Sequence, residues 1–318
     1  MEAASTSVRQ VAPSAEQVLG AAQRHIGEKL IRVVLTLAAL LTILVTVGII
    51  ASLVGETLAF FGDDAVTVKA FFTGSEWSPL FSDPQFGIRP LVQGTLIISL
   101  IGLVVAVPLG LGTAIYLSEF ARPRVRQVIK PTLELLAGVP TVVFGYFALT
   151  FFTPKVLGDL AGLDVSVFNG LAGGIIVGIM IVPTIASIAE DAMTAVPHGL
   201  REGAYGVGAS RRQVSTRVVF PAALSGIVAA VVLGASRAVG ETMIVLIAAG
   251  QVPTTSADPR GPMETMTAFI GATGKGDVPT GSTGYKAIFA VGFTLFVMTL
   301  LLNAIAIRFV RRYRQVYE

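Results

Sequence analysis

The stretch PLVQGTLIISLIGLVVAVPLGLGTAIYLS, residues Pro90–Ser118, contains no charged side chain. At the 1.5 Å rise per residue of an α-helix, it is long enough to cross the roughly 30 Å hydrocarbon core of a bilayer. Its apolar residues run continuously, without the alternation that marks a lipid-facing β-strand. The stretch therefore predicts a transmembrane helix.

Five further runs of this kind are spread along the chain. Four of them carry no charge: Val33–Gly55, Leu135–Pro154, Val165–Ala189 and Ala287–Ile307. The fifth extends from Val218 to about Ala249 and is interrupted by Arg237 and Glu241. We therefore expect an all-α integral membrane protein with six transmembrane helices.

The composition agrees with a membrane protein and excludes several kinds of site. Charged residues make up 14% of the 318 residues, apolar residues make up 53%, and the mean hydropathy is +0.76. Typical soluble domains carry roughly 25% charged residues. The absence of cysteine excludes disulfides, thiolate metal sites and a cysteine nucleophile. Because His25 and His198 are the two histidines, we do not expect a histidine metal cluster.

The basic residues indicate the orientation. Sixteen of the 23 lie before the first run, in the second and fourth connections, and after the last run, while the other connections carry six and Arg237 lies inside a run. The positive-inside rule then places both termini in the cytoplasm. We expect a tail at 1–30, disordered over its first twenty-odd residues, a membrane domain at 31–312 with its core at about 90–308, and a second tail at 313–318. The first run is too long for a signal-peptide core and is predicted to be retained.

A helix, a tight turn and a second helix are predicted in the fourth connection. Pro197 is suited to the first helical turn, and Gly208 is suited to end the helix, because glycine accepts positive φ angles. The first helix has a small apolar stripe at i, i+4 and i+7, formed by Leu200, Ala204 and Val207. Ser210 and Gln213 have the spacing of a capping box at the start of the second helix.

A DNA-binding helix-turn-helix is one alternative for this segment, with Arg211, Arg212 and Arg217 as phosphate contacts. However, the second helix continues directly into the run that begins at Val218. A helix tied to the bilayer in this way cannot lie freely in a major groove. We therefore favour a short helix that presses its face against a soluble partner protein.

The same residues resemble the cytoplasmic loop of ABC importer permeases, which reads E-A-A, three residues, G, nine residues, I-x-L-P. Here Glu202-Gly203-Ala204 is followed by three residues, Gly208, nine residues and Val218-Val219-Phe220-Pro221. The spacing is intact, although Gly203, Val218 and Phe220 differ in residue type. The resemblance implies the type I (MetI-like) permease fold. It also implies a coupling helix in a cleft of the ATPase, with Glu202, Gly203, Ala204, Gly208 and Pro221 as coupling residues.

Three other segments resemble the phosphate permeases of this family. Ser236–Met243 is similar to their R-A-x-G-E-T segment, and Leu136–Gly145 is similar to their third-span signature. Trp77, Phe86-Gly87 and Gly94-Thr95 resemble the PstC member rather than its PstA partner. The resemblance covers about residues 30–312 and implies a permease subunit of an ATP-driven phosphate importer in the bacterial plasma membrane.

This resemblance implies an assembly of several chains. A second, PstA-like permease would complete the pathway, two copies of a PstB-like cytoplasmic ATPase would hydrolyse ATP, and a PstS-like external protein would deliver phosphate. The chain itself is then expected to be no enzyme and to bind no cofactor, with ATP and Mg²⁺ on the ATPase. Gly274-Lys275 does not form a P-loop, because Phe269 and Gly276 occupy positions that need Gly and Ser/Thr.

Two opposite charges lie deep in the run that follows Val218. Arg237 is about 24 Å beyond Pro221 along a continuous helix, and Glu241 would lie one turn further on the same face. A charge at such a depth costs at least about 2.5–3.5 kcal/mol, so these residues normally face a bundle interior or a water-filled path. We expect Arg237 to bind the passing phosphate, Glu241 to hold and partly neutralise it, and Thr242 to add a hydroxyl. A purely structural ion pair is the alternative.

Three other functions remain open at the level of sequence. The anion could be sulfate or molybdate instead of phosphate. The chain could be a proton-coupled secondary carrier with Glu241 as the proton site, although we find no inverted repeat within the six runs. It could also be a receptor or assembly factor that transports nothing, for which the two intramembrane charges would be unusual.

Overall fold

The computed structural model of the chain describes the backbone of residues 15–276 and 278–313, and side chains over 27–276 and 278–308. The chain divides between Val54 and Gly55 into two units. The first unit contains most of helix α1, Ala15–Phe61. The predicted disorder of the N-terminal tail is therefore wrong from Ala15 onward, because the Ala, Gln and Glu residues there are good helix formers. Its first fourteen residues lie outside the described part of the chain.

The second unit contains the remaining elements. In chain order they are α2 Val68–Thr73, α3 Arg89–Ile115, η1 Tyr116–Phe120, α4 Pro123–Ala137, α5 Thr141–Phe147, η2 Ala148–Leu160, α6 Gly170–Thr194, α7 His198–Gly206, α8 Arg211–Val214, η3 Ser215–Val219, α9 Phe220–Ala222, α10 Leu224–Val239, α11 Met243–Ala248, α12 Met266–Thr273 and α13 Thr283–Tyr313. The η segments are π-helical continuations of α3, α5 and α8. Because α13 extends to Tyr313, the expected C-terminal tail lies, apart from that residue, outside the described range.

Six apolar spans are confirmed when one bent pair is counted as a single span. Among the described residues, five helices are long and apolar enough to cross a membrane. The sixth consists of Arg211–Ala222 followed by Leu224–Val239, which meet at an angle of 72°. The bend follows Pro221, whose ring and missing N–H disturb a regular helix.

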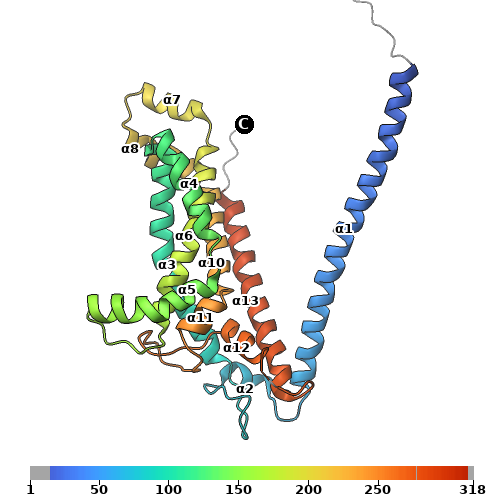
Figure 1. The fold of residues 1–318 in the computed structure, drawn as a ribbon, viewed down its shortest axis with the longest axis vertical. Coiled ribbons are helices and arrows are strands. Elements are labelled where there is room, and N and C mark those ends of the chain that lie inside the picture. The colour runs from blue at the N-terminus through green and yellow to red at the C-terminus, as the bar shows by residue number, and fades with distance from the viewer. Residues whose placement is uncertain (1–14, 277, 314–318) are drawn as a thin grey trace, which may run out of the picture. The chain divides into compact units, whose positions relative to one another are not determined.

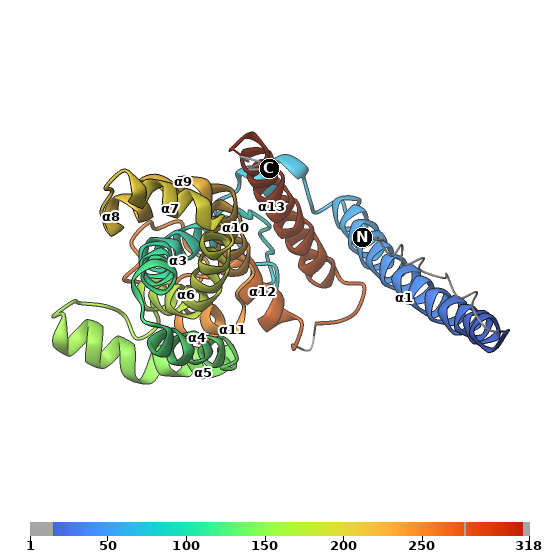
Figure 2. The ribbon, with the colours of Figure 1, turned by 90° about the horizontal axis from the view of Figure 1, so that it is seen from above.

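The third predicted span is divided, so its boundaries were wrong. Helix α4 ends at Ala137, and the chain resumes as a helix at Thr141. The break coincides with Pro140, which adopts an extended ψ angle before the new helix. The light-green helix that continues from α5 lies across the direction of α3 and α6 in both views (Figures 1 and 2). Only part of the predicted Leu135–Pro154 run is therefore parallel to the bundle.

Helices α3 and α6 form the centre of the bundle and approach each other at glycines (Figure 2). A Cβ atom added to Gly178 would lie 2.7 Å from the carbonyl oxygen of Gly102. A Cβ atom at Gly174 would lie 2.7 Å from Cβ of Ile101. Small residues allow this close backbone packing, which stabilises helix association within a membrane.

We predict that Gly178→Val lowers the stability of the isolated chain by about 1–3 kcal/mol or more, because the colliding atom belongs to backbone and cannot move aside. The measurement is thermal unfolding in detergent. Gly112→Val is the matched control, since it lies on α3 and has no atom within 4 Å of an added Cβ. Equal melting temperatures for the two variants would contradict the close packing of α3 against α6.

The aromatic segment between the first two spans forms a small core of its own. Phe60 and Phe71 are completely buried, and Trp77 and Phe86 are 4% and 8% exposed. Their rings meet edge to face, with centroids 5.3 Å apart for Phe60 and Phe86. The segment is therefore folded on itself and against Phe269 of α12, with a centroid distance of 5.0 Å to Trp77. Burying aromatic rings against one another stabilises this arrangement by area and by ring geometry.

Candidate functional site

The apolar run from Val218 to Ala249 is interrupted at its two charges, Arg237 and Glu241. Helix α10 ends at Val239, and α11 begins at Met243. Arg237 therefore lies in the last turn of α10, while Glu241 lies in the short junction between the helices. The prediction that the two residues share one helical face was wrong. Gly240 is the C-cap of α10, with a φ angle of −86°, and the regular helix does not continue beyond it.

The guanidinium of Arg237 is exposed on the surface of the chain. Its Nη1 donates to Oγ1 of Thr184 in α6, at 3.1 Å. This hydrogen bond is the one polar contact of the side chain within the described part of the protein, so most of its five N–H donors have no partner there. Thr184 thus orients a cation whose remaining donors are available to an anion.

Glu241 is buried and serves the backbone of the next helix. One carboxylate oxygen, Oε1, accepts from the amides of Met243 at 3.0 Å and Ile244 at 3.1 Å. The backbone carbonyl of Glu241 accepts from Oγ1 of Thr267 at 2.7 Å. No ion pair joins Glu241 to Arg237 among the residues described. The predicted role of Glu241 in holding Arg237 is therefore corrected: Glu241 satisfies amides at the start of α11.

Thr242 occupies the same junction and is partly exposed. Its hydroxyl donates to the carbonyl of Gly240 at 3.2 Å. Its methyl group packs toward Gly271 of α12, where an added Cβ would lie 3.0 Å away. The structure thus brings the three predicted pathway residues to the end of α10 and the junction after it, each with a different local partner.

The predicted helix–turn–helix of the fourth connection is confirmed. Gly208 has a φ angle of +83°. Its amide donates to the carbonyl of Tyr205 at 2.9 Å, and the amide of Ala209 donates to the carbonyl of Ala204 at 3.1 Å. This pair of bonds is the Schellman motif that ends helices with a left-handed residue. Ser210 caps α8 through the predicted capping box.

One face of α7 packs on the bundle and the other is open. Leu200 and Ala204 pack against a buried cluster formed by the ends of α3, α6 and the α8–α10 segment. Val207 is 86% exposed and does not belong to the stripe, because it follows the last helical residue. Gly203 and Gly206 have no atom within 4 Å of an added Cβ.

The remaining predicted coupling residues lie on or near this open surface. Glu202 is exposed, and so is Pro221 at the bend before α10. Tyr205, which was not among the predicted coupling residues, is exposed as well. Gly208 also has no neighbour within 4 Å of an added Cβ, so this position is open on the surface of the chain. Figure 1 shows α7 and α8 at one end of the bundle, with α11 and α12 toward the other end.

Arg201 fastens α7 to the bundle, and the sequence analysis did not identify it. Its Nη1 donates to the carbonyl of Val196 at 2.5 Å, and its Nη2 donates to the carbonyl of Met193 at 2.7 Å. The same Nη2 contacts the carboxylate of Glu119 at 3.1 Å. Because Glu119 lies in η1 and Met193 in α6, one side chain ties α7 to two spans.

A second ionic cluster joins α4 to the same end of α6. The carboxylate of Glu190 is completely buried and pairs with Arg126 and with Lys130, the latter at 2.7 Å. Thr194 donates to Glu190 at 3.0 Å, and Lys130 also contacts Asp191 at 2.7 Å. A buried carboxylate needs such partners, since an unpaired one would be strongly destabilising. The pairs are separated by about sixty residues, so sequence spacing does not reveal them.

Comparison with known proteins places these features in context. Residues 106–315 match the family model described as binding-protein-dependent transport system inner membrane component. The chain is 35% identical to the probable ABC transporter permease protein YqgH of Bacillus subtilis, covering 87% of this chain and 89% of that protein. It is 34% identical to the phosphate transport system permease protein PstC of Mesorhizobium japonicum, covering 85% of each. For PstC 1 of Mycobacterium tuberculosis the identity is 37%, with 76% and 81% covered.

Solved structures resemble the fold. A chain of a bacterial alginate ABC transporter, in complex with its alginate-bound periplasmic protein, aligns with a TM-score of 0.63 at 21% identity, over 92% of this chain and 99% of that one. A chain of the inward-facing MetNI methionine ABC transporter aligns with a TM-score of 0.55 at 20% identity, over 72% and 95%. At these identities the likeness concerns the fold and not the transported molecule.

Proposed function

We propose that this chain, which belongs to the family of binding-protein-dependent transport system inner membrane components, is the permease subunit of an ATP-driven phosphate importer. The PstC relatives, at 34% and 37% identity over most of the chain, support phosphate as the cargo. The R-A-x-G-E-T segment that first suggested phosphate contains Arg237, Glu241 and Thr242.

The observation that carries the proposal is the exposed guanidinium of Arg237 in an apolar span. A charge at this depth is costly in lipid, so the surface around it must face another protein or a water-filled path. The planar guanidinium offers paired N–H donors that match the oxygens of a phosphate group. A second permease packed on this face would enclose a path in which phosphate meets Arg237, and Thr184 would keep the side chain aimed at it.

The open face of α7 fits the coupling role. Gly203 and Gly206 have no side chains that project from this face, and Tyr205 is exposed on it. The face can therefore fit closely into a cleft of a partner protein. Arg201 transmits any displacement of α7 to α6 and η1, because it donates to the carbonyl of Met193 on α6 and to the carboxylate of Glu119 on η1. Movement driven by an ATPase thereby reaches the spans around Arg237.

The remaining parts of the proposal are supported by the PstC relatives and by the excess of basic residues at the termini and in the second and fourth connections. A PstA-like permease, two PstB-like ATPase copies and a PstS-like external phosphate-binding protein complete the assembly. ATP and Mg²⁺ bind the ATPase, while this chain holds neither and catalyses no reaction. The protein spans the bacterial plasma membrane with both termini in the cytoplasm.

Reconstituted complexes test the proposed cargo. Proteoliposomes that contain the full assembly, with the ATPase side facing inward and ATP enclosed in the vesicles, should accumulate radiolabelled phosphate. Uptake should stop without ATP and should persist when the proton gradient is collapsed, because the energy comes from the ATPase. Sulfate and molybdate in tenfold excess over phosphate are the matched competitors. Strong inhibition by either, or uptake that follows the proton gradient, would overturn the assignment.

Cysteine labelling tests the orientation independently. Arg211→Cys and Ser282→Cys place single thiols in a chain that has none. Arg211 is the exposed first residue of the bent span, and Ser282 directly precedes the last span. The excess of basic residues predicts that a membrane-impermeant maleimide labels position 282 from outside and position 211 from inside. Labelling of both from one side would refute the six-span orientation.

A further inference from the structure

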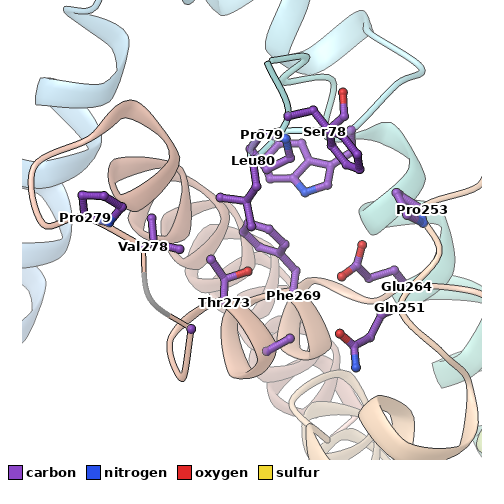
Figure 3. A pocket seen from close by; sticks show the side chains of 14 residues that line it. Ser78, Pro79, Leu80, Gln251, Pro253, Glu264, Phe269, Thr273, Val278 and Pro279 are labelled. Atoms are coloured by element: carbon purple, nitrogen blue, oxygen red, sulfur yellow. The ribbon is translucent and has the colours of Figure 1, made fainter. Parts of the chain in front are cut away.

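A cavity of about 570 Å³ lies away from Arg237 and from the coupling surface. Its wall is formed by the aromatic segment at Trp77–Phe81, by the segment at Gln251–Pro253, by Glu264 and by α12. Figure 3 shows the carboxylate of Glu264 turned toward this space, between Gln251 and Phe269. A cavity of this size accommodates a small organic molecule or a long side chain.

Glu264 is a buried carboxyl group without a partner. It is 6% exposed, and no hydrogen bond or ion pair joins its carboxylate to any described residue. Burial raises its pKa to about 7, because the charged form loses hydration. The group lies in the connection before α12, outside the six spans. A buried carboxylate in this condition is stabilised when a cation enters beside it.

The backbone around Glu264 contacts α3 and is hydrogen-bonded to it, so the position of this residue is well defined. The carbonyl of Glu264 lies directly against Gly94 of α3, where any side chain would collide with it. Next to it, the amide of Met266 donates to Oγ1 of Thr95 at 3.0 Å. Thr265 caps α12 by accepting from the amide of Ala268, also at 3.0 Å. The Gly94-Thr95 pair thus holds the carboxyl group at the cavity.

The other residues that line the cavity indicate whether a metal ion or an organic cation fits beside Glu264. Trp77 and Phe269 meet edge to face and present aromatic surface, and a cation over an aromatic ring is attracted to its electron-rich face. Within the described residues, no group of three or more His, Cys, Asp or Glu is placed to hold a metal ion. The other described lining residues carry no charge, and Lys275 precedes the rim residue Gly276 without lining the cavity. The lining also contains the neutral polar side chains of Ser78, Gln251 and Thr273. The indole N–H of Trp77 is buried without a hydrogen-bond partner among the described residues. A single carboxylate among aromatic, apolar and neutral polar groups suits an organic ammonium better than a hard metal ion.

We propose that this cavity binds an alkylammonium group, with Glu264 as its counter-ion and the aromatic rings of Trp77 and Phe269 as its walls. The ammonium could belong to a free amine or to a lysine side chain of a docked protein. This site is separate from the phosphate pathway and does not depend on the nature of the cargo.

Trp77 supplies the signal for a direct test, because it is the single tryptophan of the chain. The full chain, purified in a maltoside detergent, is titrated with n-butylammonium chloride while tryptophan fluorescence is followed. We expect a saturable change, whereas 1-butanol and matched sodium chloride give none. Apparent affinity should be about tenfold weaker at pH 6 than at pH 8, because a carboxyl with a pKa near 7 must lose its proton to pair with the amine. The amine itself stays charged throughout this range.

Variants of Glu264 distinguish binding at this cavity from a general effect of the charge of the protein on the fluorescence. Glu264→Gln has nearly the same shape and removes the buried charge, so it should fold and lose the saturable response. Glu264→Asp keeps the charge on a shorter stem and should retain a weaker response with the same pH dependence. Glu76→Gln is the matched control, since Glu76 is an exposed neighbour of Trp77 that does not line the cavity. It should behave as the unaltered chain.

Nα-acetyl-lysinamide then identifies the source of the ammonium. A saturable, Glu264-dependent response to it supports a lysine side chain, and a response to n-butylammonium alone supports a free amine. Equal responses to n-butylammonium and 1-butanol would overturn the proposal. Retention of the response by Glu264→Gln would overturn it as well.

Discussion

Replacing Arg237 by methionine is expected to abolish phosphate uptake while the permease still folds and assembles. Methionine preserves most of the apolar stem and removes the charge, so the cost of placing a cation in the span also disappears. Charge-assisted hydrogen bonds are worth about 1.5–3 kcal/mol each, so losing even one from the transported anion slows transport at least about tenfold. The measurement is uptake in proteoliposomes, normalised to assembled complex.

Conservative variants distinguish a role in binding from a role in packing. Arg237→Lys keeps the charge without the planar pair of donors and should retain partial activity. Thr184→Val removes the hydroxyl that accepts from Arg237 at 3.1 Å and should weaken uptake less than Arg237→Met does. Arg124→Met, at an exposed position in the first turn of α4, is the control for a lost cation. Wild-type uptake by Arg237→Met would reduce this residue to a structural role.

The hydrogen bonds of Glu241 determine which effect on transport its variants are expected to have. If it neutralised Arg237, Glu241→Gln would impair transport as strongly as loss of the arginine. Since its Oε1 accepts from two backbone amides, a glutamine oxygen can do the same, and Glu241→Gln should transport nearly normally. Glu241→Leu should instead lower the stability of the junction before α11, by about 1–3 kcal/mol for each amide left unsatisfied.

Gly208→Val is expected to uncouple ATP hydrolysis from phosphate uptake. The φ angle of +83° lies in a region that costs a residue with a Cβ about 1–2 kcal/mol, and more when it is β-branched. The Schellman bonds that end α7 would open, and the face offered to the ATPase would lose its shape. Uptake per ATP hydrolysed, measured in the assembled complex, should fall at least fivefold.

Asparagine provides the matched variant at this position. Asparagine tolerates the left-handed region, so Gly208→Asn should keep most of the coupling. An added Cβ at Gly208 meets no atom of this chain within 4 Å, so steric conflict inside the permease does not account for the difference. Equal coupling in the valine and asparagine variants would exclude backbone conformation as the cause.

Much of the architecture could be predicted from the sequence, because a bilayer imposes strong local rules. A segment that crosses it must be continuously apolar and helical, so the six runs were visible without any tertiary information. The turn at Gly208 and the capping box at Ser210 were also predictable, since each depends on residues within one helical turn. The proposal of a role for Arg237 followed from its charge in an apolar run.

Tertiary structure decided what depends on contacts between distant segments. Thr184 lies 53 residues from Arg237, and Glu190 lies about sixty from Arg126 and Lys130, so no spacing rule links them. The sequence predicted Glu241 as the partner of Arg237. Because α10 ends at Val239, Glu241 instead accepts from backbone amides at the start of α11.

The burial of the aromatic segment and of Glu264 also depends on contacts between distant segments and could not be predicted from the sequence. Phe60 and Phe71 are completely buried among other aromatic rings, and their positions in the sequence do not reveal this burial. In the sequence, Glu264 is an isolated carboxylate in a connection, and only the approach of Gly94 and α12 makes it a buried group facing a cavity. Local sequence determined the apolar helices and the turn and cap at Gly208 and Ser210, whereas the helix breaks at Pro140 and after Val239 were seen only in the structure. The partners of each polar side chain depended on which helices pack together, because burial and hydrogen bonding are properties of the assembled bundle.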